Sequence, residues 1–289
     1  MVWIIGCNGM LGREVSGFFE KEKIPFVGTD MDCDITDISA LSEFAKGKDI
    51  SWIINCSAYT NVDKSEEEEP KAYSINAAGA ANIAQTASAV GAKLIHISTD
   101  YVFNGQGNSP YKESDAKQPL GAYGRTKSAG EDLVAAKTDK YFIIRTAWLY
   151  GKNGNNFVHT MLRLFTEKDS LNVVADQKGT PTWAGTLALL IKKIIETDSV
   201  KYGIYHCTDE GETTWYDFAC AIQKYAFDSG LISKKIPINP VPSSEYPAKT
   251  ERPKYSVLSK EKIKSEFSFI PDNWDTILKN YITERSKSI

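Results

Sequence analysis

Short apolar runs alternate with amphipathic stretches along the first half of the chain. The apolar runs occupy residues 2–5, 25–28, 52–55, 93–98 and 141–145. Nearly continuous apolar strands of this length are typical of a parallel sheet that is covered on both faces. The stretches between them, such as residues 11–22 and 73–91, have the spacing of helices that bury one side. The pattern therefore predicts an α/β fold built on a doubly wound parallel sheet.

The alternation ends near Gly151. The second half is richer in Pro, Trp and Tyr, and it contains proline-bearing stretches at residues 176–183 and 238–255. We therefore expect residues 1–150, with some later segments returning to them, to form the sheet domain. Residues 151–289 are expected to form a smaller C-terminal lobe at the carboxyl edge of the sheet, where ligands of open α/β sheets bind.

Composition narrows the classes of function. The 289 residues carry 34 basic and 37 acidic side chains, for a formal net charge of −3 and a pI of about 5.8. A protein without a strongly basic surface lacks the long-range attraction expected of a nucleic-acid binder. The chain start has no basic leader, and no stretch reaches the ~18 apolar residues that a membrane span needs. We therefore expect neither a nucleic-acid partner nor a membrane association.

The cysteines and histidines do not indicate a metal site. Five cysteines are scattered without a CxxC pair, and the three histidines lie far apart in the sequence. Scattered cysteines within apolar runs are typical of reduced, buried thiols. The expected location is therefore the cytoplasm, where thiols stay reduced.

A glycine-rich loop follows the first predicted strand. Gly6, Gly9 and Gly12 form a GxxGxxG pattern at the start of an amphipathic helix. Glycines at such a junction let the backbone approach a pyrophosphate, which the free N–H groups and the positive end of the helix dipole then bind. The pattern predicts a Rossmann-type, NAD(P)-binding domain within residues 1–150. The candidate cofactor contacts in this loop are Gly6, Asn8, Gly9, Met10, Leu11 and Gly12.

The ends of the next two strands supply further candidates. Asp30 lies eighteen positions after Gly12, close to the ~20 expected for an acid that binds the adenosine ribose. Such an acid favours NAD, whereas Arg13 could offset it for the 2′-phosphate of NADP, and Asp30 could instead only cap a turn. Further cofactor contacts are expected from Asp34, Ile35, Ala58, Tyr59 and Thr60.

Two groups of polar residues suggest proton transfer. Ser98, Thr99 and Asp100 follow the fourth predicted strand, and Tyr123 and Lys127 are spaced one helical turn apart. A free tyrosine, with a pKa of about 10, is a slow acid at neutral pH. A nearby ammonium would lower that pKa, and a hydroxyl from Thr99 or Ser98 could hold a substrate oxygen near the phenol. By itself, such a pair is more often two surface side chains.

Together, the glycine loop, Asp30, the strand end at Thr99 and the Tyr123-x-x-x-Lys127 pair resemble the short-chain dehydrogenase/reductase superfamily in its extended form. Related sugar-nucleotide dehydratases carry Thr-Asp-Glu at the strand end. This chain has Tyr101 in place of the glutamate, which favours simple carbonyl reduction over dehydration. Seven segments resemble the family of dTDP-4-dehydrorhamnose reductases: STDYVFNG, YGRTKSAGE, RTAWLYG, NNFVHTMLRL, DQKGTPTW, TTWYDFA and RPKYSVL.

The resemblance implies a specific reaction. NADPH or NADH would deliver hydride to C4 of dTDP-4-dehydro-β-L-rhamnose, and Tyr123 would protonate the emerging alkoxide. Both Tyr123 and Lys127 would contact the cofactor. Lys127 would bind the nicotinamide ribose and would lower the pKa of the Tyr123 phenol. The residues expected at the substrate are Thr99, Asp100, Trp148 and Arg252, of which Arg252 would bind the diphosphate or else be a surface side chain. Trp183 and Trp215 are interpreted as core.

Other implications of the resemblance are less specific. Some family members bind magnesium through glutamates between subunits, and Glu14 matches one such position, so magnesium and a homodimer are conceivable here. The fold also serves a non-catalytic regulatory subunit, and related enzymes reduce or epimerise other nucleotide sugars. These alternatives stay open at the level of sequence, as does the choice between NADH and NADPH.

Overall fold

The structure is a computed structural model that describes residues 1–246 and 249–287. Its centre is a six-stranded sheet in the order β2-β1-β3-β4-β5-β10, with every pairing parallel. The strands are β1 (Val2–Ile5), β2 (Phe26–Thr29), β3 (Trp52–Asn55), β4 (Lys93–Thr99), β5 (Tyr141–Thr146) and β10 (Gly203–His206). The five apolar runs thus form five neighbouring strands, which confirms the predicted doubly wound parallel sheet.

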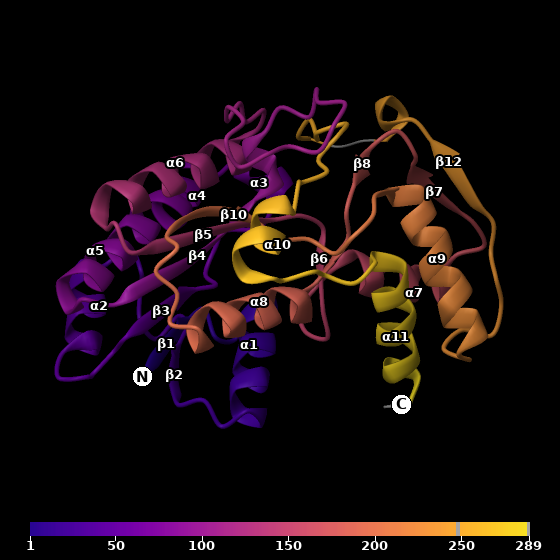
Figure 1. The fold of residues 1–289 in the computed structure, drawn as a ribbon. Helices are drawn as coiled ribbons and strands as arrows, with labels where there is room; N and C mark the ends of the chain where they lie inside the picture. The colour runs from indigo at the N-terminus through magenta and orange to yellow at the C-terminus, as the bar shows by residue number, and fades with distance from the viewer. Residues whose placement is uncertain (247–248, 288–289) are drawn as a thin grey trace.

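Helices cover both faces of this sheet (Figure 1). One face packs against α1 (Met10–Lys21), α8 (Ala184–Glu196) and α10 (Glu261–Phe267). The other face packs against α2 (Ile38–Ala45), α5 (Ala80–Val90) and α6 (Ala122–Lys137). Because the side chains of a strand alternate between faces, a strand buried on both sides is mostly apolar. β1 is apolar at every position, and β3 is apolar up to the buried Asn55 at its end.

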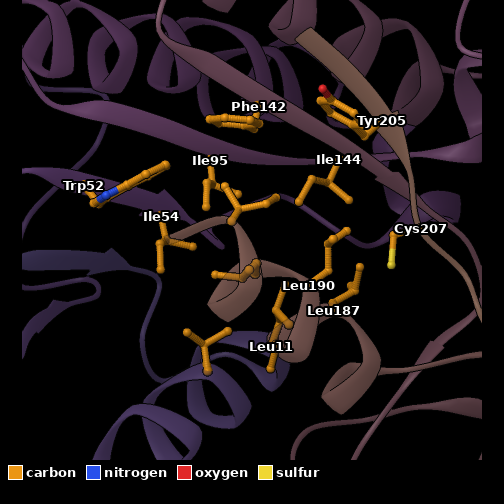
Figure 2. Close-up of a cluster of buried hydrophobic side chains, with 14 of the residues drawn as sticks. Leu11, Trp52, Ile54, Ile95, Phe142, Ile144, Leu187, Leu190, Tyr205 and Cys207 are labelled. Atoms are coloured by element: carbon orange, nitrogen blue, oxygen red, sulfur yellow. The ribbon is translucent and has the colours of Figure 1, made fainter. Parts of the chain in front are cut away.

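The core on the α1 and α8 side joins distant parts of the chain. Figure 2 shows Ile54, Ile95 and Ile144 from three strands beside Leu187 and Leu190 of α8. Strand β10 and helix α8 therefore belong to the sheet domain, although both come from the second half of the sequence. The division of the chain at residue 150 into a cofactor-binding domain and a substrate-binding lobe stays a prediction.

The helical stretch expected at residues 73–91 begins earlier and is not uniform. It consists of α4 (Glu69–Tyr73), a π-helical segment η1 (Ser74–Gly79) and α5, which ends at Gly91 in the left-handed conformation (φ +74°). Within the π-helical segment, the side chain of Asn76 accepts a hydrogen bond from the Tyr59 backbone N–H at 2.8 Å and donates to Thr126 of α6 at 3.2 Å. Such local widening of a helix is frequent at functional sites.

The remaining elements form a lobe with its own apolar cluster, at the right of Figure 1. Its helices are α7 (Phe157–Glu167), α9 (Trp215–Asp228) and α11 (Trp274–Ser286). Three two-stranded sheets pair β6 (Leu149–Tyr150) with β9 (Thr182–Trp183), β8 (Lys178–Gly179) with β11 (Thr213–Thr214), and β7 (Leu171–Val174) with β12 (Ile238–Val241). Outside this lobe, the short helical turns α3 (Val62–Ser65) and η2 (Asp100–Val102) contact α6 of the sheet domain, and the turn η3 (Ser243–Glu245) follows β12.

One feature of the sheet topology bears on ligand binding. The chain runs from β1 outward to β2 and then returns to β3 on the other side of β1, so the winding reverses between β1 and β3. Open α/β sheets bind ligands beyond the carboxyl ends of the strands at such a reversal. In the described part of the chain, no helix is long and apolar enough to cross a membrane.

Candidate active site

The glycine loop lies at the reversal between β1 and β3. Gly6 has a φ of +78°, and a Cβ atom there would lie 2.8 Å from the backbone nitrogen of Ser57. A Cβ atom on Gly12 would lie 2.1 Å from the carbonyl oxygen of Gly6. The loop therefore turns in a conformation that favours glycine, and it touches the end of β3 and the first turn of α1 so closely that no side chain fits.

The start of α1 faces an open pocket. Gly9 precedes the helix and provides no side chain to bond the first N–H groups, so these donors are available to a ligand. A pocket of about 590 Å³ lies beside them, lined by Ile5, Gly6, Asn8, Gly9, Asp30, Met31, Cys33, Asp34, Ile35, Cys56, Ser57, Ala58 and Ile75. Donors without partners, a glycine cradle and an apolar floor fit a nucleotide that carries a pyrophosphate.

Asp30 ties the end of β2 to the glycine loop. One carboxylate oxygen accepts the Asn8 N–H at 2.9 Å, and the other accepts the Met31 N–H at 3.0 Å. Arg13 donates to the Asn8 carbonyl oxygen at 2.9 Å, which holds its guanidinium at the same loop. Asp30 thus caps a turn and also borders the pocket, so the two interpretations of this residue are compatible.

The other expected cofactor residues differ in their access to this pocket. Asp34, Ile35 and Ala58 line it. Leu11 is buried in the core, and Met10 packs against Gly151.

Tyr59 and Thr60 are absent from the pocket wall. The Tyr59 hydroxyl donates to Glu68 at 2.8 Å. Cys33, Ser57 and Ile75 line the pocket but were missed from sequence, because small and apolar residues carry no chemical signature.

The Thr99 hydroxyl and the Tyr123 phenol meet at the carboxyl end of β4. The buried Thr99 hydroxyl donates to Asp100 at 2.9 Å and accepts the Tyr101 N–H at 3.2 Å, and its position beside the phenol opposes the rise in the pKa of Tyr123 that burial causes. The net effect raises the pKa of Tyr123 to about 12. Beside them, burial raises the pKa of Asp100 to about 6, and the hydrogen bond that the Thr99 hydroxyl donates to this carboxylate at 2.9 Å opposes the shift.

Lys127 lies one turn further along α6. Its ammonium group is buried and donates to the Ile97 carbonyl oxygen at 2.6 Å. Burial lowers the pKa of Lys127 to about 8, and the Glu131 carboxylate opposes this shift. Desolvation of the phenol is the largest effect on the pKa of Tyr123 and raises it, so the expected influence of Lys127 on this pKa stays a prediction.

Arg252 reaches the same region from the C-terminal half. Its guanidinium donates to Asp63 of α3 at 3.3 Å, and its charge opposes the burial that raises the pKa of Tyr101. The Tyr101 ring in turn packs edge-on against Tyr123, with ring centroids 5.5 Å apart. Arg252 is therefore part of the group of side chains around Tyr123. Asp63 and Tyr101 were not among the expected site residues.

Trp148 is held in a strained backbone conformation at the start of the second lobe. Its φ is +46°, and its indole stacks on Trp215 with centroids 3.6 Å apart. The Trp148 ring also packs against Gly179, where a Cβ atom would lie 2.5 Å from the ring. Non-glycine residues in this region cost free energy and cluster at functional sites. Trp215, interpreted as core from sequence, is the partly buried partner that orients this indole.

Metal ligands do not gather in the described residues 1–246 and 249–287, where no group of three or more His, Cys, Asp or Glu side chains could hold an ion. Glu14 is nearly buried, and burial raises the pKa of its carboxyl, with Lys152 opposing and Glu284 adding to the shift.

Residues 1–287 match the family described as RmlD substrate binding domain. A dTDP-4-dehydrorhamnose reductase of Aggregatibacter actinomycetemcomitans is 39% identical over 283 residues, which is 96% of both chains. A crystal structure of the dTDP-4-dehydrorhamnose reductase of Clostridium acetobutylicum superposes with a TM-score of 0.92 at 42% identity, covering 98% of this chain and 99% of that one. The enzyme of Bacillus anthracis, solved in complex with NADP, has a TM-score of 0.92 at 40% identity and 98% coverage of each chain.

Proposed function

The chain belongs to the RmlD substrate binding domain family, and on this premise we propose that it is an NAD(P)H-dependent oxidoreductase that reduces the C4 carbonyl of dTDP-4-dehydro-β-L-rhamnose to give dTDP-L-rhamnose. The observation that carries the proposal is the position of the Thr99 hydroxyl beside the Tyr123 phenol, at the carboxyl edge of the sheet whose glycine loop frames a nucleotide pocket. A hydroxyl and a protonated phenol that converge on one point are what a carbonyl oxygen needs as it gains negative charge.

The glycine loop and the first turn of α1 would hold the cofactor pyrophosphate. When bound, NAD(P)H supplies the hydride. Ala58 and Ile35 offer a narrow apolar wall, and Asp34 is fixed by hydrogen bonds from the Thr36 backbone and hydroxyl, both at 2.8 Å. Lys127, buried on the inner face of α6, is the cationic donor for ribose hydroxyls, a role expected from the family resemblance.

Proton transfer would use Tyr123 in its neutral form. A phenol with a pKa of about 12 is protonated throughout the neutral range, so the donor is always loaded. The alkoxide that forms at C4 is a stronger base than a phenolate, so it takes the proton even from this weak acid. The Thr99 hydroxyl, which donates to Asp100 in this structure, would turn its single proton to the phenolate left behind and stabilise it.

The substrate roles of Asp100, Arg252 and Trp148 are proposals of the same kind. Asp100 is buried beside Thr99, where it could accept a sugar hydroxyl. Arg252 would bind the diphosphate, because a guanidinium matches phosphate geometry. Trp148 offers a flat indole whose orientation is set by Trp215 and Gly179.

The direct test supplies the purified protein with dTDP-4-dehydro-β-L-rhamnose and either NADPH or NADH. We expect the absorbance of the reduced nicotinamide to fall and dTDP-L-rhamnose to appear. Other nucleotide 4-ketosugars are run in parallel, and preferential turnover of one of them would show that a different sugar is the substrate. No turnover of any sugar, together with a stable complex with another enzyme, would support the regulatory-subunit alternative.

The structure supports use of both cofactors, because Asp30 shares its charge with two backbone N–H groups and Arg13 lies at the same loop. Replacing Asp30 by Asn removes the negative charge that repels a 2′-phosphate. We expect the ratio of kcat/KM for NADPH to that for NADH to rise about tenfold, which corresponds to ~1.4 kcal/mol.

Loosening of the loop would affect both cofactors alike, so the ratio isolates the charge. Asp49→Asn, before the amino end of β3, is the matched control and should leave the ratio unchanged. An unchanged ratio in Asp30→Asn would remove this residue from cofactor selection.

A second prediction concerns Trp148. Replacing Gly179 by Ala places a methyl group against the indole, 2.5 Å from the ring in the present geometry, so the indole has to move. We expect KM for the dTDP-sugar to rise about tenfold with little change in the affinity for NADPH. Steady-state kinetics and NADPH fluorescence titration measure the two quantities. Lys178→Ala, its exposed neighbour, is the control, and equal kinetics for both variants would contradict the role of Trp148.

Magnesium near Glu14 and a homodimer stay predictions that follow from the family resemblance.

A further inference from the structure

One face of α6 holds the last residues of β4 through three successive contacts. The helical residues are spaced four apart, so they lie in one row along the helix. The contacts join Tyr123 to Thr99, the Lys127 ammonium to the Ile97 carbonyl oxygen at 2.6 Å, and the Glu131 carboxylate to the Ser98 hydroxyl at 2.6 Å. The first two contacts belong to the proposed reaction, whereas Glu131 and Ser98 have no part in it so far.

Glu131 is also fixed from the neighbouring strand. Arg145 of β5 forms a two-point ion pair with it, at 2.9 Å and 2.7 Å, and the side chains of both residues are only 1% exposed. Lys117 lies 3.5 Å from the same carboxylate, and Arg145 lies 3.4 Å from a ring nitrogen of His206 in β10. This carboxylate therefore links α6 to both β4 and β5.

The energetics of a buried ion pair favour a role in positioning the elements that it joins. Burying two charges removes their hydration, and a well-packed apolar pair is often as stable or more stable. A buried ion pair whose hydrogen bonds are all made instead selects one arrangement of the elements it joins. Here the elements are the helix that carries Tyr123 and the strand that carries Thr99.

We infer that Glu131 is a positioning residue that, through Ser98 and Arg145, sets α6 against the end of β4 so that the Thr99 hydroxyl and the Tyr123 phenol meet. This role rests on the proposed reduction. Ser98 precedes Thr99 directly, so its hydroxyl transmits the position of Glu131 to the catalytic threonine with one peptide unit between them. A displacement of about 1 Å at reacting groups can cost a hundredfold in rate.

Glu131 also acts on the charge of Lys127. Burial lowers the pKa of Lys127 to about 8, and the Glu131 carboxylate is the group that opposes this shift. From β4, the buried His96 faces Lys127, and burial together with that ammonium lowers the pKa of the imidazole well below its usual value. His96 is therefore neutral near pH 7 and adds no competing charge. Loss of the Glu131 charge should lower the pKa of Lys127 further.

The first test is Ser98→Ala, which removes one hydrogen bond and leaves the Glu131–Arg145 pair intact. We expect kcat for the dTDP-sugar to fall about tenfold, while the melting temperature and the dissociation constant for NADPH stay close to those of the unchanged protein. A kcat equal to that of the unchanged protein, or a parallel loss of NADPH binding, would overturn the inference.

The second test is Glu131→Gln, with Asp132→Asn as the matched control. Asp132 is the next residue of α6, and its exposed carboxylate pairs only with Lys117 among the contacts of the described chain. The ammonium form of Lys127 exists below its pKa, so a lower pKa moves the alkaline fall of kcat/KM to lower pH. We expect that shift in Glu131→Gln and none in Asp132→Asn.

The pKa of Lys127 can also be read by NMR titration of the lysine side chains in the protein alone. This titration needs no turnover, so it separates the proposed reduction from the proposed role of Glu131. If the unchanged protein reduces no sugar, the proposed function fails, yet the NMR shift still reports on Glu131. If the sugar is reduced and the Lys127 titration in Glu131→Gln is unchanged, the inference fails. Should Glu131→Gln not fold, the kcat of Ser98→Ala decides.

Discussion

Replacing Tyr123 by Phe is expected to lower kcat roughly a thousandfold, within the range of ~10²–10⁴ that general acid catalysis contributes. Phe keeps the edge-on packing against Tyr101 and removes only the hydroxyl that lies beside Thr99. Without the phenol, the alkoxide at C4 loses its general acid and must take its proton from water. NADPH binding should change little, because the nucleotide pocket is formed by other residues.

Single-turnover kinetics and NADPH fluorescence titration measure these two outcomes. Tyr141→Phe is the control, since this tyrosine begins β5 and so lies at the amino ends of the strands, away from the site at their carboxyl ends. Turnover in Tyr123→Phe within about threefold of the unchanged protein would remove the phenol from the mechanism, because the loss of a general acid costs far more.

Replacing Gly12 by Ala is the second large effect. The added Cβ would lie 2.1 Å from the carbonyl oxygen of Gly6 and 2.7 Å from the Cα of Cys7, both of which are backbone atoms. Neither can move without distorting the turn that presents the N–H groups to the pyrophosphate. We expect the free energy of unfolding to fall by about 3 kcal/mol. NADPH affinity should fall more than tenfold.

Gly17→Ala is a matched control in the same helix. A Cβ atom at Gly17 meets nothing within 4 Å, so the variant should gain up to ~1 kcal/mol from helix propensity. Denaturant unfolding and NADPH titration compare the two variants. Equal NADPH affinity in Gly12→Ala and Gly17→Ala would falsify the placement of the pyrophosphate at this loop.

Much of the sheet domain could be predicted because its signals are local. A strand that is buried on both faces is mostly apolar, as all of β1 and the first three residues of β3 are. The glycine loop is equally readable, since the left-handed turn at Gly6 and the contact at Gly12 exclude side chains. Tyr123 and Lys127 lie in one helix, as their spacing predicts.

The electrostatics of the site could not be predicted in the same way. From the sequence, an ammonium one turn from a phenol should lower its pKa. In the folded chain, burial dominates and raises the pKa of Tyr123 to about 12, and Lys127 donates to Ile97 instead. Which effect is larger depends on how deeply the folded chain buries the phenol, and burial is set by the packing of elements that are distant in the sequence.

By itself, the sequence determined the doubly wound sheet, the nucleotide loop at its first turn and the order of the catalytic candidates. Each depends on residues that are neighbours along the chain, through strand burial, backbone freedom or helical spacing. Only the tertiary structure decided which distant residues support them: β10 beside β5, Trp215 against Trp148, and Arg145 against Glu131. These contacts depend on how whole elements pack, and a buried charge or a stacked ring leaves no periodic trace in the sequence.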